Sequence, residues 1–182
     1  VLPHMTVLSP MDAVETKKML YAMAEYNGPC YIRINRNDLP VYMDENEEYH
    51  IGKITQIRDG KDVVVFANGV MVSQAMAAAE ELEKEGISVR VVNLSTIKPL
   101  DVEALKGFCE GVKGVVTAEE HNVYGGVGSA VCEALSGSRL PIKMVGIEDT
   151  YGRSAENYQL LLETYHLMPA DVAEAVKAVL QA

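Results

Sequence analysis

A short strand followed by a glycine-rich helix start, at residues 114–135, constrains the fold of this chain more than any other stretch. Val115 and Val116 form an apolar run of the kind that is buried on both faces of a parallel sheet. The run gives way to the polar segment 117–121, and small and apolar residues at helical spacing follow from Gly125. This order predicts a strand, a polar loop, a glycine turn and a helix. Ligands usually bind at such a loop, beyond the carboxyl end of a strand.

The glycines of this stretch invite comparison with a dinucleotide-binding fingerprint, but their spacing argues against one. That fingerprint places its glycines in the tight turn directly after the strand, whereas residues 118–124 intervene here. Val131 also stands in the place of the third glycine. The better explanation is that small residues let the helix start close against a sheet or another subunit.

The composition argues against several classes of protein. A net charge of −10 makes nucleic acid or an anionic membrane surface a poor partner. No apolar run approaches the ~20 residues of a membrane-spanning helix, and the first residues lack the pattern of a signal peptide. Cys30, Cys109 and Cys132 are scattered and odd in number, which favours buried thiols in a reducing cytoplasm over a zinc site or a disulfide framework.

The N-terminal part of the chain predicts a β-α-β unit. Strands are expected at 6–8 and 30–34, around a helix with Ser9 as its N-cap. One face of this helix is expected to carry Ala13, Thr16, Leu20 and Met23. Such a unit is too small to bury its own faces, and the sequence begins with Val rather than Met. We therefore expect this unit to be the end of a domain whose earlier part precedes residue 1.

A polar, acidic stretch at 37–49 is expected to be a linker. Its acids have no regular ligand spacing, so a solvated charge run is favoured over a metal site. Residues 1–44 are accordingly assigned to the β-α-β remnant and the start of the linker, and residues 45–182 to a second domain. In this domain Asp59-Gly60 lies between two apolar runs and predicts a β-hairpin with antiparallel strands.

Strands and helices alternate through the rest of the chain. Further strands are expected at 63–67, 88–93 and 141–146, in addition to the strand near residue 115. Helices are expected after Asn68-Gly69, after Asp101 as an N-cap, near 157–164 and from Pro169. This alternation predicts an α/β fold, organised as a three-layer sandwich.

Several stretches, taken in order, resemble the transketolase family in the form in which the enzyme is split into two chains. Residues 96–101 (TIKPLD), 117–122 (TAEEHN) and 125–130 (GGVGSA) resemble its C-terminal domain. Residues 6–13 (TVLSPMDA) and 31–36 (YIRINR) resemble the end of its pyrimidine-binding domain. The resemblance covers nearly the whole chain. It implies a mixed, mostly parallel five-stranded sheet with one antiparallel strand, which agrees with the predicted hairpin.

The resemblance also implies a thiamine diphosphate enzyme that moves a two-carbon ketol unit between sugar phosphates. In that family a magnesium ion holds the diphosphate and a carboxylate helps to form the reactive ylid. Both groups belong to earlier parts of the enzyme, so neither thiamine diphosphate nor Mg²⁺ is expected to bind to this chain alone. We expect a section without a catalytic centre, which serves in subunit assembly and in contact with the substrate phosphate. Its partners would be the N-terminal section, which carries the diphosphate-binding domain, and a second copy of itself.

Arg36 is the residue whose role the resemblance transfers most directly. It falls where transketolases place an arginine that binds the phosphate of the substrate, and a guanidinium offers a rigid fork for phosphate oxygens. Asn35 stands where many relatives have Ser, a departure that is not expected to abolish the contact. From the residues alone, a surface arginine paired with Asp38 or Asp44 is the alternative.

Glu120 and His121 are expected to be polar residues of a loop or of a subunit interface. An acid–base or phosphate-binding role for His121 is the less favoured alternative. Two other interpretations of the whole chain remain open. One is the C-terminal domain of deoxyxylulose phosphate synthase or of a 2-oxoacid dehydrogenase beta subunit. The other is a module for dimerisation or docking with no chemistry of its own.

Overall fold

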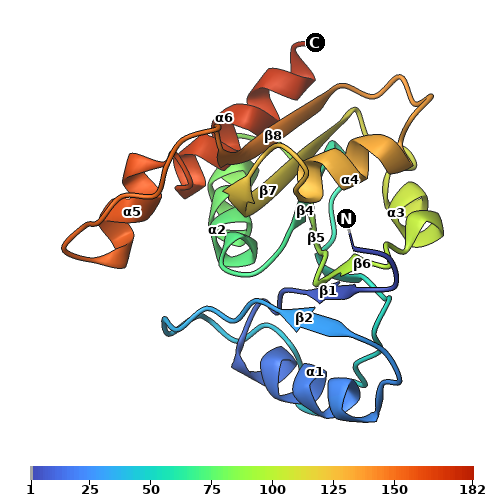
Figure 1. Ribbon diagram of the computed structural model, residues 1–182. Coiled ribbons are helices and arrows are strands. Elements are labelled where there is room, and N and C mark those ends of the chain that lie inside the picture. The colour runs from blue at the N-terminus through green and yellow to red at the C-terminus, as the bar shows by residue number, and fades with distance from the viewer. Residues whose placement is uncertain (1) are drawn as a thin grey trace.

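The computed structural model describes residues 2–182, and Val1 lies outside the described residues. Its larger sheet has five strands in the order β3, β5, β4, β7, β8 (Figure 1). Their bounds are Thr55–Arg58, Val89–Asn93, Val63–Ala67, Gly114–Asn122 and Ile142–Ile147, in the same order. Strands β4, β5, β7 and β8 run parallel, and β3 runs antiparallel to its neighbour β5. The predicted mixed sheet with one antiparallel strand is therefore confirmed.

The predicted hairpin between β3 and β4 is wrong, although the direction of β3 is right. β3 pairs with β5, with Thr55 opposite Asn93, and β5 lies between β3 and β4. The Asp59-Gly60 turn packs against the start of β5, where a Cβ atom on Gly60 would collide with the backbone of Val89. Gly60 therefore lets the backbone pass close to the backbone of β5, and it does not form a two-residue hairpin turn.

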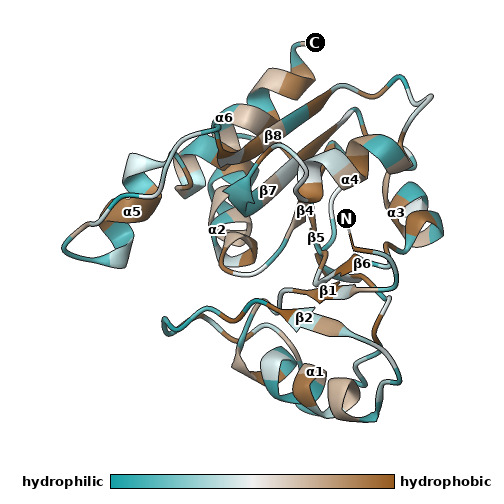
Figure 2. Ribbon diagram, viewed as in Figure 1, coloured by the Kyte–Doolittle hydropathy of each residue, from teal (hydrophilic) through white to brown (hydrophobic). Residues whose placement is uncertain are grey.

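Helices cover both faces of this sheet and complete the predicted three-layer sandwich (Figure 1). Helices α2 (Met71–Lys84) and α6 (Pro169–Leu180) pack on one face, whereas α3 (Val102–Phe108) and α4 (Val127–Ala134) pack on the other. Successive side chains of β4 point to opposite faces of the sheet. Val63 and Val65 pack in the core under α2 and α6, whereas Val64 and Phe66 pack in the core under α3 and α4. Figure 2 shows hydrophobic residues concentrated along these central strands.

The helix starts in this part of the chain follow the sequence signals. Asp101 caps α3, as predicted, and accepts a hydrogen bond from the backbone N–H of Ala104. Helix α5 (Tyr158–Thr164) is capped by Asn157, which accepts from the backbone N–H of Leu160. Helix α6 begins at Pro169 and buries the predicted stripe, which consists of Val172, Val176 and Val179.

A smaller sheet joins the N-terminal unit to the rest of the chain. Strands β1 (Thr6–Leu8) and β2 (Cys30–Ile32) pair in parallel around α1 (Ala13–Glu25), as the β-α-β prediction required. The third strand, β6 (Thr96–Lys98), pairs antiparallel with β1 and was not predicted. The segment 96–98 is thus an edge of the small sheet rather than a simple connection to α3.

The start of α1 differs from the prediction. Asp12, not Ser9, is the N-cap, and its carboxylate accepts from the backbone N–H of Glu15. Glu15 and Met19 are the buried residues of the helix, whereas Leu20 is 46% exposed. The buried Glu15 carboxylate accepts hydrogen bonds from the backbone N–H of Met11 and from Asn93 Nδ2, and hydrophobic periodicity does not reveal such a buried polar side chain.

Two smaller expectations also need correction. Strand β7 continues to Asn122, so the polar segment 117–121 belongs to a strand rather than to a loop. Cys109 is buried, but Cys30 and Cys132 are only half-buried, and all three are free thiols.

The acidic stretch around residues 44–48 is mostly exposed, as expected of a linker. Within residues 2–182, no helix combines the length and the apolarity needed to cross a membrane.

Candidate functional site

The candidate site is a pocket of about 300 Å³ where the small sheet meets the carboxyl ends of β4 and β7. The carboxyl end of β2 supplies one wall, and Tyr158, the first residue of α5, supplies another. We call it the arginine pocket, and its lining residues are Ser9, Pro10, Arg33, Ile34, Asn35, Arg36, Asn37, Gly69, Val70, Glu120 and Tyr158. The carboxyl ends of parallel strands are where α/β folds usually bind their ligands.

Arg33 connects the two sheets across this pocket. Its Nη1 donates a hydrogen bond of 2.6 Å to the backbone carbonyl of Glu120. Its Nη2 lies 3.8 Å from the position that a Cβ atom on Gly69 would occupy. The guanidinium is therefore held against the strand ends of β4 and β7, and a Cβ atom at residue 69 would be in ordinary contact with it but only 3.2 Å from Ser9 Oγ. Gly69 also has a φ of +55°, which favours glycine.

The two arginines give the pocket a positive character. Among residues 2–182, no carboxylate lies within ion-pair distance (4.0 Å) of Arg33 or Arg36. The alternative in which Arg36 pairs with Asp38 or Asp44 is thus not observed. Arg36 is exposed and lines the rim of the pocket. Two guanidinium groups without ion pairs suit an anionic ligand such as a phosphate.

A chain of hydrogen bonds crosses the pocket from Glu120 to Asn35. The Tyr158 hydroxyl donates to Glu120 Oε1 at 2.8 Å and accepts from Asn35 Nδ2 at 3.0 Å. Burial raises the pKa of Tyr158, and the negative charge of Glu120 raises it further. The phenol therefore keeps its proton, and the chain of hydrogen bonds keeps its donor.

Glu119 and His121, on either side of Glu120, point away from the pocket. Glu119 is buried and accepts hydrogen bonds from the backbone N–H groups of Val127 and Gly128, at the start of α4. Burial raises its pKa, whereas these hydrogen bonds act in the opposite direction. His121 is exposed, and its Nδ1 lies 2.8 Å from the carbonyl oxygen of Asn122 and 3.9 Å from Glu119 Oε2.

The structure thus brings together two of the three candidate residues of the sequence. Arg36 and Glu120 line the arginine pocket, and His121 lies outside it. Arg33 and Tyr158 complete the pocket but were not among the candidates. Arg33 could have been noticed because it stands three residues before Arg36. Tyr158 carries no local signal, because its partner Asn35 is 123 residues away.

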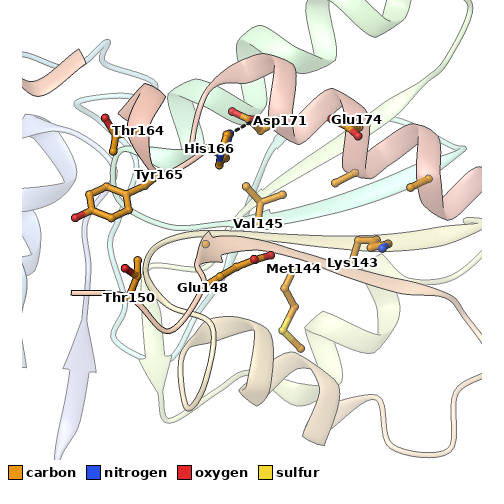
Figure 3. A pocket seen from close by; sticks show the side chains of 13 residues that line it. Lys143, Met144, Val145, Glu148, Thr150, Thr164, Tyr165, His166, Asp171 and Glu174 are labelled. Carbon is orange, nitrogen blue, oxygen red and sulfur yellow. Dashed lines mark ion pairs between the residues drawn. The ribbon is translucent and has the colours of Figure 1, made fainter. Parts of the chain in front are cut away.

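A second hollow, of about 400 Å³, lies between the edge strand β8 and α6. Figure 3 shows Lys143 on β8 and Glu148 just after this strand, with Glu174 on the side of α6. Nearby, His166 Nδ1 lies 3.6 Å from Asp171 Oδ1. The hollow mixes charges of both signs and contains none of the candidate residues. The arginine pocket is therefore the better candidate site.

Residues 52–172 match the profile of a known family, whose description is "Transketolase, C-terminal domain". This match covers more than half of the chain. The chain belongs to the transketolase family. Its large sheet and the helices around it are the C-terminal domain of a transketolase-family subunit, and the α/β fold expected from the sequence is that of the family.

Relatives of the split type support this assignment. One subunit of the apulose-4-phosphate transketolase of Phocaeicola vulgatus is 37% identical over 158 residues, which cover 85% of this chain and 51% of that protein. The solved structure of a split-gene transketolase, described as an inactive β4 tetramer, superposes with a TM-score of 0.93 at 42% identity. That match covers 100% of this chain and 59% of that chain.

An enzyme with another name also matches. The 1-deoxy-D-xylulose-5-phosphate synthase of a Synechococcus strain is 36% identical over 185 aligned positions, which cover 99% of this chain but 28% of that enzyme. The chain spans about half the length of the split-type relatives that it matches.

Proposed function

We propose that the chain is part of the C-terminal section of a split, thiamine diphosphate-dependent transketolase, which transfers a two-carbon ketol unit between sugar phosphates. The observation that carries the proposal is the arginine pocket, where Arg33 and Arg36 lie at the carboxyl ends of parallel strands and have no ion-pair partner among residues 2–182. The similarity to relatives that are named as subunits supports it. An N-terminal section would be the partner.

We propose that parts of the enzyme outside this chain bind thiamine diphosphate and Mg²⁺. The arginine pocket offers cationic side chains, which suit a phosphate rather than a cation. Among residues 2–182, no group of three His, Cys, Asp or Glu side chains could hold a metal ion. The diphosphate and its metal would then be held by the N-terminal section.

Two parts of the chain would have different tasks. We propose that residues 1–44 are the end of the pyrimidine-binding domain and the start of the linker, and that residues 45–182 are the C-terminal domain. The antiparallel pair of β1 and β6 supports a fixed junction between them. The assembled enzyme would contain two copies of this chain. It would act in the cytoplasm. His121 would contribute to a subunit interface.

Within the pocket, we assign the contact with the substrate phosphate to Arg36. Its exposed guanidinium stands at the pocket rim, just beyond the carboxyl end of β2, where a sugar phosphate could reach it. Arg33 is already engaged by the Glu120 carbonyl and holds the wall in place. Glu120 has a supporting role, because its carboxylate accepts the Tyr158 hydroxyl rather than facing the ligand.

The test compares Arg36→Ala with wild type in the enzyme assembled with its N-terminal section. A hydrogen bond to a charged group contributes about 1.5–3 kcal/mol. At about 1.4 kcal/mol per tenfold, phosphorylated donors should bind roughly ten- to a hundredfold more weakly. Hydroxypyruvate, used without a phosphorylated acceptor, should be turned over nearly as before. Arg139→Ala, an exposed arginine outside the pocket, is the matched control.

Equal losses for the two donors would show that Arg36 supports the fold rather than the phosphate. The match to 1-deoxy-D-xylulose-5-phosphate synthase supplies a second candidate function. An assembled enzyme that forms 1-deoxy-D-xylulose 5-phosphate, and does not transfer a ketol unit, would favour that candidate.

A further inference from the structure

The loop that carries Arg36 is tied to the C-terminal part of the chain by residues on both sides of this arginine. We propose that Tyr158 is a positioning residue for Arg36, because its hydroxyl holds Asn35 against Glu120 and so fixes the loop in the orientation needed for phosphate contact. The inference rests on the proposed role of Arg36, and it adds a residue from a distant helix to that role.

The loop after β2 alternates between half-buried and exposed side chains. Arg33, Asn35 and Asn37 are half-buried, whereas Ile34 and Arg36 are exposed. Successive side chains of an extended segment point to opposite sides. The odd-numbered residues therefore face the protein, and Arg36 is presented outward. A rotation of the segment by one residue would turn Arg36 away from the pocket rim.

Asn35 uses both ends of its amide to hold this loop. Its Oδ1 accepts hydrogen bonds from the backbone N–H of Asn37 at 2.8 Å and from Asn37 Nδ2 at 2.7 Å. Its Nδ2 donates to the Tyr158 hydroxyl at 3.0 Å. The two residues that flank Arg36 are thus connected to each other, and Tyr158 connects the pair to the rest of the molecule.

The far end of this connection is anchored in regular secondary structure. Tyr158 is the first residue of α5, directly after the N-cap Asn157. Glu120 lies in β7 and accepts the Tyr158 hydroxyl at 2.8 Å, while its backbone carbonyl accepts from Arg33 at 2.6 Å. One residue of the large sheet therefore holds the loop at residue 33 directly and at residue 35 through Tyr158.

Inorganic phosphate is a direct probe, because its binding does not require turnover. Titration of the ¹⁵N-labelled chain, followed by the backbone amide shifts of residues 35–37, gives a dissociation constant for each variant. Tyr158→Phe removes the hydrogen bonds to Asn35 and to Glu120, and only the neutral one, from Asn35, reaches the loop. Loss of one neutral hydrogen bond corresponds to a change of about three- to tenfold in the dissociation constant. We expect Tyr158→Phe to weaken phosphate binding by this factor, and Arg36→Ala to weaken it at least as much.

The double variant separates positioning from a general structural role. If Tyr158 acts through Arg36, Tyr158→Phe should cause no further loss in the Arg36→Ala background. Glu120→Gln keeps an acceptor for the hydroxyl and should bind phosphate within about twofold of wild type, whereas Glu120→Ala should resemble Tyr158→Phe. Tyr165→Phe removes a hydroxyl that donates to the Tyr151 carbonyl, next to the same helix, and is the control.

The possible outcomes are distinguishable. Unchanged binding in Tyr158→Phe, with a clear loss in Arg36→Ala, would overturn the positioning role and leave the proposed function of Arg36 intact. Additive losses in the double variant would likewise assign Tyr158 to general stability. Unchanged binding in Arg36→Ala would overturn the phosphate contact itself, and the positioning role with it.

Discussion

The buried carboxylate of Glu119 accepts a hydrogen bond of 2.8 Å from the backbone N–H of Gly128, and its other oxygen accepts one of 2.7 Å from Val127. Helix α4 thus receives its N-terminal cap from the neighbouring strand β7, because its own N-cap, Gly126, has no side chain. A Cβ atom on Gly126 would collide with the same carboxylate. Gly126 therefore makes room for the capping carboxylate of Glu119.

Removal of this cap should destabilise the fold. Glu119→Ala leaves two backbone donors without a partner at a buried site, and each unsatisfied donor costs about 1–3 kcal/mol. The ionised carboxylate is itself costly to bury, so we expect a net loss of about 1–3 kcal/mol in the free energy of unfolding, measured with urea. Glu133→Ala, an exposed glutamate of α4, should change it by less than about 0.5 kcal/mol. Equal changes in the two variants would contradict the capping role.

Glu15 should make folding stability depend on pH. Burial raises its pKa above the ordinary value of 4.5, and the nearby charge of Asp12 adds to this shift. The Glu15 carboxyl group therefore stays protonated to a higher pH in the folded chain than in the unfolded chain. Its contribution to the free energy of unfolding is fully present below about pH 4.5 and is lost as the pH rises through the folded-state pKa.

Glu15→Gln cannot ionise and is the direct comparison. We expect wild type to lose stability relative to this variant as the pH rises from about 4.5 towards 7.5, in urea unfolding at a series of pH values. Glu119 is present in both proteins, so its own titration cancels. A difference that stays constant across this range would show that Glu15 titrates alike in the folded and unfolded chains.

The exposed side of α1 should support self-association. Leu20 is 46% and Tyr21 is 67% exposed, and both line a groove of about 750 Å³ beside Ile34. Apolar patches of this kind mark interfaces, and burial of one leucine contributes about 1.5–3 kcal/mol. Leu20→Glu should therefore weaken dimerisation by about tenfold or more, measured by sedimentation equilibrium. Leu160→Glu, at an exposed leucine of α5, is the control. A wild-type chain that stays monomeric at high concentration would count against the interface.

The contrast between β3 and β4 shows what the sequence could predict about the fold. The positions of β3 and β4 and the antiparallel direction of β3 followed from apolar runs and from the Asp59-Gly60 turn. The pairing of β3 with β5 did not follow, because a non-local partner leaves no mark in either segment. The same limit applies to β6, whose partner β1 lies at the other end of a long stretch of sequence.

The arginine pocket shows the same limit at the level of the site. Arg36 was identified through the family resemblance, and the structure places it at the rim of a pocket. Tyr158 and Glu120 meet across 38 residues of sequence, and Asn35 joins them from the other end of the chain. Helical periodicity around Tyr158 predicted α5 but not the direction of this hydroxyl. Only the folded chain brings these three side chains together.

Reconstitution of ketol transfer tests the central claim most directly. Residues 1–182 cover about half of the split-type relatives, so the test uses a C-terminal section of the full length of those relatives that contains these residues. This section, with thiamine diphosphate, Mg²⁺ and a ketose phosphate donor, is mixed with increasing amounts of the N-terminal section while transfer to an aldose phosphate is followed. We predict no transfer above background by residues 1–182 alone, and an activity of the full-length section that rises with the N-terminal section and saturates at one such section per C-terminal section. Ketol transfer by residues 1–182 without a partner, or none by the full-length section at any ratio of the two sections, would contradict the account.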